Sequence, residues 1–103
     1  MLNADVRQLE YFVAAADAGS YSSAAKVLYV SPQAVSKSVQ ALERHLGVML
    51  FDRGPNGISL TEFGRQFRER ASELLDAFGQ LEAMADDYRH QHTEAVSVGI
   101  HSL

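Results

Sequence analysis

The sequence predicts a mainly α-helical fold in which three short helices and a two-stranded hairpin precede one long helix. Apolar residues recur at helical spacing in three segments between residues 5 and 46, and a cluster of turn formers occupies residues 54–57. An apolar heptad pattern then extends from residue 67 to residue 88. A chain of 103 residues, 47% of them hydrophobic, has room for one small domain with an extension but not for two domains.

The composition excludes several classes of protein. The chain has no cysteine, which rules out disulfide bonds, thiolate zinc sites and cysteine nucleophiles. Its first residues lack the basic and apolar regions of a signal peptide, and no apolar run reaches the roughly 18 residues of a membrane span. We therefore expect a soluble protein of the cytoplasm.

The net charge of -4 is distributed unevenly along the chain. Residues 20–68 contain six Lys and Arg against three Asp and Glu, whereas residues 69–103 contain two against seven. This division suggests that the first segment faces a polyanion and that the second faces water or protein.

The first two helices are predicted from an apolar stripe and from capping residues. Residues 5–18 form the first, with Asp5 as its cap and Gly19 as the residue that ends it. A shorter second helix is expected to have Ser22 as its cap and to extend through Val30. The stripe of the first helix consists of Leu9, Phe12, Val13 and Ala16.

The third helix has the sharpest start signal in the chain. Ser31 can accept a hydrogen bond from free helix amides, and Pro32 at the first helical position loses no bond that the helix needs. Gly47 ends this helix. Its buried face consists of Val35, Val39, Leu42 and Leu46. Its opposite face is polar and basic, and shows Gln33, Ser36, Lys37, Gln40 and Arg44.

After Gly47 the pattern becomes extended. Residues 48–53 and 58–60 are predicted strands, joined by the turn at residues 54–57, so they form a small β-hairpin. Such a hairpin beside three helices is typical of a winged helix-turn-helix.

The long helix is expected to cover residues 61–92 and to pair with a second copy of the chain. Seven apolar residues, called the heptad stripe below, step by four and three without a break, which favours packing against the same helix of another subunit. Packing against the chain's own domain is the alternative. The heptad stripe consists of Phe67, Ala71, Leu74, Phe78, Leu81, Ala85 and Tyr88.

Residues 96–100 alternate between apolar and polar types as a strand would.

A winged helix-turn-helix with this third helix points to DNA. A helix fits the major groove, and short side chains near its N-terminus let its backbone approach the base edges. Gln33 can read adenine or donate to guanine or phosphate, and Lys37 suits guanine or the DNA backbone. Ser36 can pair with almost any base edge or with phosphate. Pro32 and Ala34 offer apolar surface to a thymine methyl group.

Arg53 is expected at the tip of the hairpin. From there its guanidinium could enter a minor groove or hold its edge. A surface arginine without a partner is the alternative for this residue.

Three motifs, in this order, resemble the N-terminal DNA-binding domain of LysR-type transcriptional regulators. They are LEYFVAAADAGSYSSAA, SPQAVSKSVQALERHLGVMLFDR and LTEFG, within residues 7–64. The resemblance implies a winged helix-turn-helix at residues 1–60, a linker helix at 61–92 that pairs subunits, and residues 93–103 as the first strand of a larger effector-binding domain. Without that domain, residues 93–103 would be disordered or paired with another copy.

The resemblance also implies the residues that contact DNA. Six on the third helix would read the major groove, Arg53 would be the contact of the wing, and Ser22 and Ser23 would anchor phosphates. The six are Ser31, Pro32, Gln33, Ala34, Ser36 and Lys37. Family members bind as dimers, or as tetramers in the full-length protein, and respond to a small molecule through the effector-binding domain.

Other functions have less support in the sequence. No serine lies in a nucleophile motif, residues 54–57 lack the ending of a phosphate loop, and no cofactor is expected. His90 and His92 lie two residues apart and so on different faces of a helix, which argues against a metal site with His101. Two alternatives remain: a winged-helix repressor of another family, such as the MarR-like proteins, and a dimerisation or protein-interaction module.

Overall fold

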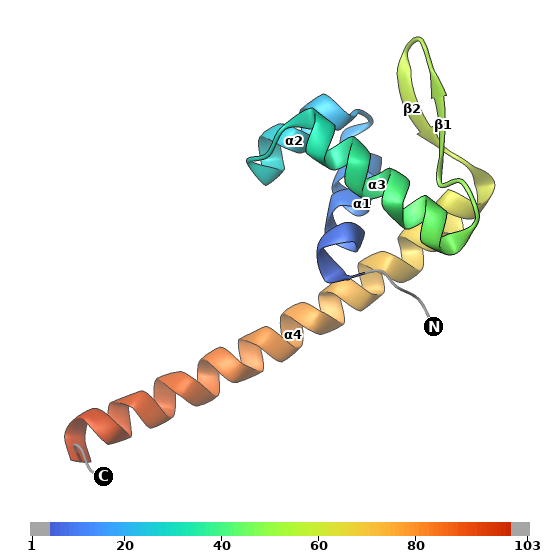
Figure 1. Cartoon of the computed structure of the whole chain (residues 1–103). Coiled ribbons are helices and arrows are strands. Elements are labelled where there is room, and N and C mark those ends of the chain that lie inside the picture. The colour runs from blue at the N-terminus through green and yellow to red at the C-terminus, as the bar shows by residue number, and fades with distance from the viewer. Residues whose placement is uncertain (1–4, 100–103) are drawn as a thin grey trace.

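The computed structural model describes the backbone of residues 5–99 and the side chains of residues 5–92. Three helices, α1 (Val6–Ala18), α2 (Tyr21–Leu28) and α3 (Pro32–Leu46), precede a hairpin of β1 (Phe51–Gly54) and β2 (Gly57–Leu60). The last element is the long helix α4 (Glu62–Gly99), which extends away from the other elements (Figure 1). This is the predicted mainly α fold, and the described helices include none with the length and hydropathy for crossing a membrane.

The start of each short helix is capped by a side chain, and one predicted cap was wrong. Asp5 accepts a hydrogen bond from the backbone of Gln8, and Ser31 accepts one from Ala34, as expected. In α2, however, Ser20 is the cap and accepts from the backbone N–H of Ser23. The backbone of Ser20 is extended, which is the conformation of a capping residue, whereas Ser22 already lies inside the helix.

Residues in the left-handed region end the three short helices. Gly19 and Gly47 end α1 and α3 with φ of 78° and 73°. Tyr29, with φ of 60°, ends α2, so α2 is shorter than the prediction, which extended it to Val30. The backbone N–H groups of Tyr29 and Val30 both bond to the carbonyl of Ala25, which closes the helix at this point.

The core lies where α1, α2, α3 and the base of the wing meet, with α4 packed against α1. Phe12 is fully buried, and the centroid of its ring lies 5.4 Å from that of Phe51 at the start of β1 and 5.6 Å from that of Phe67 in α4. An ion pair between Arg68 and Asp17 also joins α4 to α1. The buried apolar residues are Leu9, Phe12, Ala15, Ala24, Ala25, Val35, Val39, Leu42, Leu50, Phe51 and Ala71.

The wing, defined here as Phe51–Leu60, is a two-stranded antiparallel hairpin in which Phe51 pairs with Leu60 and Gly54 with Gly57. The first strand begins later than the predicted residue 48. The Leu50 carbonyl still accepts from the N–H of Thr61, but the N–H of Leu50 donates to the Glu43 carboxylate instead of to the opposite strand, so the ladder ends there. Arg53 pairs with Ile58, so it lies on the strand and not at the tip.

The long helix begins as predicted and ends later. The hydroxyl of Thr61 accepts a hydrogen bond from the N–H of Gly64 at 2.9 Å and so caps α4. The helix continues to Gly99, past the predicted end at residue 92, and replaces the predicted strand up to that residue. A helix bonds locally, whereas a strand needs a neighbouring strand, and the described chain offers none there. Residues 100–103 of the predicted strand segment lie outside the described residues.

Candidate nucleic-acid interface

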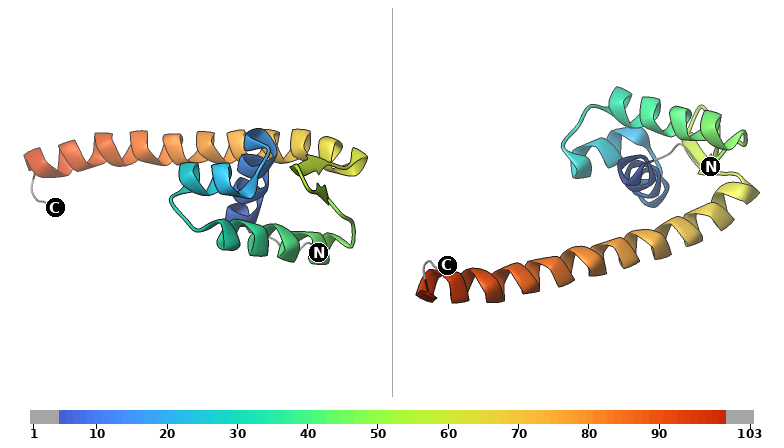
Figure 2. Two further views of the ribbon diagram at one scale, coloured as in Figure 1. Left: turned by 90° about the horizontal axis from the view of Figure 1, so that it is seen from above. Right: turned by 60° about the horizontal axis from the view of Figure 1, so that its bottom comes forward.

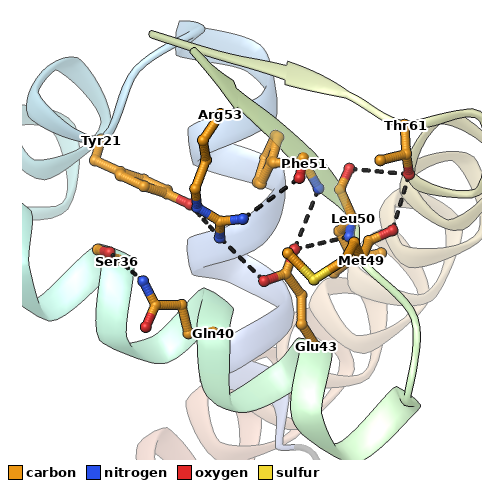
Figure 3. Close-up of polar contacts among 9 residues, drawn as sticks. All are labelled: Tyr21, Ser36, Gln40, Glu43, Met49, Leu50, Phe51, Arg53 and Thr61. Carbon is orange, nitrogen blue, oxygen red and sulfur yellow. Dashed lines mark hydrogen bonds and ion pairs between the residues drawn. The ribbon is translucent and has the colours of Figure 1, made fainter. Parts of the chain in front are cut away.

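The first two turns of α3 present a polar, basic surface to solvent. Ser31, Pro32, Gln33 and Lys37 are exposed, whereas Ala34 and Ser36 are half-buried. The hydroxyl of Ser36 accepts a hydrogen bond from the side-chain amide of Gln40, 3.1 Å away (Figure 3). The structure therefore brings the six predicted major-groove residues together in one short helical segment.

The predicted phosphate anchors lie at the start of α2. Ser22 and Ser23 are both exposed there. The backbone N–H of Ser23 is already bonded to Ser20, so Ser23 can donate to a ligand only through its hydroxyl.

Arg53 reaches back into the protein from the wing. One of its guanidinium nitrogens lies 3.0 Å from a carboxylate oxygen of Glu43 in α3 and 3.0 Å from the hydroxyl of Tyr21 in α2 (Figure 3). Its other terminal nitrogen donates to the carbonyl of Phe51 at 3.4 Å. Arg53 is thus not the arginine without a partner that the sequence left open.

Glu43 was missed by the sequence analysis, although it is the one buried charged residue among the described residues. Its second carboxylate oxygen accepts from the backbone N–H groups of Leu50 and Phe51, at 2.8 and 3.2 Å. A signal existed: Glu43 follows the buried Val39 by four residues, so it occupies the inner face of α3.

The surroundings of Arg53 and Tyr21 raise the pKa of both side chains. Burial by itself would lower the pKa of the Arg53 guanidinium, but the hydrogen bond and charge of Glu43, with Tyr21, more than offset this and raise it. Burial raises the pKa of the Tyr21 hydroxyl above its ordinary value of 10.0, and Arg53 partly opposes that rise. Arg53 therefore stays charged and Tyr21 neutral at physiological pH.

The later turns of α4 extend beyond the other helices (Figure 2), and the heptad stripe divides into two parts along this helix. Phe67 packs against the core and Ala71 is buried in it, so in the single chain these two pack against the chain's own domain, which is the alternative that the sequence left open. The physical reason is that the first turns of α4 cover α1. Beyond them, the remaining members of the stripe are exposed to solvent: Leu74, Phe78, Leu81, Ala85 and Tyr88.

Comparison with known proteins agrees with this geometry. Residues 6–65 match the family model described as the bacterial regulatory helix-turn-helix protein, lysR family. The chain belongs to the LysR family. This match removes the alternative of a winged-helix repressor from another family. The LysR family consists of transcription regulators, so the chain is not an enzyme, and its fold is that of a LysR-type DNA-binding domain.

Three curated relatives illustrate the match. The SDS degradation transcriptional activation protein of a Pseudomonas species is 50% identical over 72 residues, and the transcriptional regulator TfdS of Cupriavidus pinatubonensis is 46% identical over 72. Each alignment covers 70% of this chain but only 24% of the relative. An uncharacterized regulator of Azotobacter vinelandii, from the ibpB-leuC intergenic region, is 38% identical over 105 residues, which cover 96% of this chain and 73% of that protein. This LysR-family chain thus spans about a quarter of the length of the first two.

Two solved structures of LysR-type DNA-binding domains resemble the chain. The DNA-binding domain of CbnR in complex with DNA has a TM-score of 0.76 and 40% identity, covering 82% of this chain and 97% of that one. The DNA-binding domain of BenM in complex with catB site 1 DNA has a TM-score of 0.78 and 32% identity, covering 85% and 95%.

Proposed function

We propose that this chain binds double-stranded DNA in a sequence-specific manner, with α3 in the major groove and the wing at the adjacent minor groove. The observation that carries the proposal is the exposed polar face on the first two turns of α3. It belongs to a fold whose CbnR and BenM counterparts were solved in complex with DNA. Gln33 and Lys37 are the exposed side chains there with the reach and chemistry to read base edges.

The α3 contacts combine base readout with backbone anchoring. Ser31, Pro32, Ala34 and Ser36 let the backbone of α3 lie close to the bases, since all four side chains are short. The N-terminus of α3 attracts phosphate, and the exposed hydroxyls of Ser22 and Ser23 in α2 bond to phosphates flanking the groove.

The chain acts as a homodimer through the exposed part of the heptad stripe. Leu74 and Leu81 are 56% and 59% exposed in the single chain, which leaves a row of large apolar side chains in water. A second α4 with the same spacing buries that row. Pairing would hold two α3 helices about 34 Å apart or at a multiple of that distance, so the DNA site is an inverted repeat.

The whole regulator controls transcription in the bacterial cytoplasm. In it, residues 1–60 form the DNA-binding unit and α4 the linker, while a small-molecule effector and a tetramer involve a further domain.

Selection from a random pool of duplexes, followed by a salt titration, tests the proposal. The selected duplex and a scrambled version are titrated with the chain at several salt concentrations. We expect an inverted repeat to be enriched, the selected duplex to bind far more tightly, and affinity to fall steeply as salt rises. No enrichment and no salt dependence would contradict the proposal and would favour the protein-interaction module.

A further inference from the structure

We propose that Glu43 and Arg53 are positioning residues for DNA recognition, which together hold the wing in one orientation relative to α3. Arg53 acts through this contact and not by touching DNA with its guanidinium. The inference rests on the proposed function and concerns how the two DNA-facing elements keep their spacing.

The Glu43 carboxylate joins α3 to the wing with both of its oxygens. One accepts from the backbone N–H groups of Leu50 and Phe51, at the point where the chain enters β1. The other accepts from the Arg53 guanidinium two residues further along the same strand. Three of the first four residues that follow the exposed Met49, namely Leu50, Phe51 and Arg53, are thereby hydrogen-bonded to a single side chain of α3.

Tyr21 extends the connection to α2. Its hydroxyl lies 3.0 Å from Arg53, and its ring packs at 90° against Phe51 with centroids 6.1 Å apart. Figure 3 shows the guanidinium between the side chains of Tyr21 and Glu43. One arginine therefore contacts all three elements that carry the predicted DNA contacts, namely α2, α3 and the wing.

The same geometry explains why Arg53 does not swing out to a phosphate. Its side chain is 31% exposed, but that of Glu43 is only 5% exposed. Moving the guanidinium to DNA would leave the Glu43 carboxylate buried without a counter-charge, and such unpaired buried charges are strongly unfavourable. The Glu43–Arg53 ion pair is therefore retained when DNA binds. Arg53 influences the affinity for DNA through the orientation of the wing relative to α3.

Four variants of the 103-residue chain test the inference on the selected duplex. Glu43→Gln and Arg53→Ala break the connection. Arg70→Ala and Glu73→Gln are the matched controls, because Arg70 and Glu73, 84% and 70% exposed, form an ion pair in α4 outside the heptad stripe. Each variant is examined by hydroxyl-radical footprinting and by the slope of log affinity against log salt concentration. Thermal unfolding verifies that each variant is folded.

Glu43→Gln and Arg53→Ala are both expected to lose the protection of the DNA flank that faces the wing. Both should also bind about tenfold more weakly, which is the scale of one lost base-pair contact. The protection by α3 persists, and any change in the salt slope is the same in the two variants, because both displace the same wing. A variant that combines Glu43→Gln with Arg53→Ala binds no more weakly than Arg53→Ala alone, since both changes break one connection. The control variants behave as the wild type.

A direct contact between Arg53 and DNA gives a different pattern and would overturn the inference. Arg53→Ala would then lower the salt slope by about 0.9 for each protomer bound, and Glu43→Gln would leave the footprint intact. Arg53→Lys keeps the test decisive if Arg53→Ala fails to fold. A lysine keeps the charge but cannot reach both Glu43 and Tyr21, so continued loss of flank protection supports positioning, and restored protection contradicts it. A wild type that discriminates no duplex would instead refute the proposed function itself.

Discussion

Gly64 in the first turn of α4 lies directly against the carbonyl oxygen of Leu50, the residue that leads into the wing. A Cβ atom at position 64 would come within 2.1 Å of that oxygen. The same carbonyl accepts hydrogen bonds from the backbone and the hydroxyl of Thr61, at 3.0 and 3.3 Å. The start of α4 and the entry to the wing are therefore one packed unit, and α4 leaves the domain in a direction that this contact sets.

The first prediction concerns that contact. Gly64→Ala is expected to lower the free energy of unfolding by about 3 kcal/mol or more, because the methyl group can be accommodated only by moving the backbone. Gly79→Ala is the matched control: nothing lies within 4 Å of a Cβ there, and alanine in a helix interior stabilises by about 0.5–1 kcal/mol. Urea unfolding of both variants measures the difference, and equal stabilities would contradict it.

The second prediction separates the two serines at the start of α2. Ser20→Ala is expected to cost about 1 kcal/mol of unfolding free energy, because the Oγ of Ser20 accepts from the N–H of Ser23. Ser22→Ala is expected to change stability by less than about 0.5 kcal/mol, since Ser22 is exposed. Thermal unfolding of the two variants gives the comparison. A larger loss for Ser22→Ala would show that the cap is misassigned.

The sequence predicted local structure well because local structure depends on neighbours in the chain. The caps at Asp5 and Ser31 and the helix ends at Gly19 and Gly47 are interactions within a few residues, and all four were predicted correctly. The resemblance to LysR-type regulators predicted the family. The exposed polar face of α3 was also predicted, since helical spacing alone separates it from the buried face.

Contacts between distant parts of the chain were not predictable in the same way. Glu43 meets Arg53 across ten residues, and Tyr21 meets Arg53 across 32. No periodicity indicates such pairs, so Arg53 was expected at the hairpin tip. Ala71 fits the heptad stripe as well as Leu74 does, and only the position of α1 shows that the first is buried in the chain's own core. The end of α4 was not predictable either, because residues 96–99 could form a strand only beside a second strand, and the sequence pattern does not show whether one is present.

The third prediction tests the exposed part of the heptad stripe. Leu74→Asp is expected to abolish dimerisation without unfolding the chain, because Leu74 is exposed in the single chain and a buried, unpaired carboxylate is unfavourable in a helix pair. Sedimentation velocity measures the oligomeric state. Gln80→Asp adds the same charge at an exposed position outside the stripe and is expected to leave the dimer intact. A dimeric Leu74→Asp variant would place the interface elsewhere.

The fourth prediction concerns base recognition by Lys37. Lys37→Ala is expected to relax the preference at one base pair of each half-site, at a cost of about 1–3 kcal/mol in binding the selected duplex. Lys37 is exposed on the second turn of α3, within reach of a base edge in the proposed complex. Repeating the selection with the variant reads out the preference, with Arg70→Ala as the control. An unchanged consensus sequence would remove Lys37 from the readout.

The fifth prediction follows from the raised pKa of Tyr21. In the folded chain its hydroxyl loses its proton at a higher pH than in the unfolded chain, because burial disfavours the phenolate. Its contribution to stability is therefore complete below pH 10 and is lost as the pH rises through the folded-state pKa. Tyr21→Phe should make the decline of unfolding free energy above pH 10 shallower, as measured by urea unfolding across that range. A decline as steep as in the wild type would contradict the assignment.

Dimethyl sulfate protection of the selected duplex tests the central claim most directly, because it reports contacts to guanine N7 in the major groove. If α3 of each protomer occupies a major groove, two protected patches should appear, one in each half-site, with centres about 10 base pairs apart or at a multiple of that spacing. Protection confined to one half-site, or none at a concentration of chain that saturates the duplex, would contradict the account.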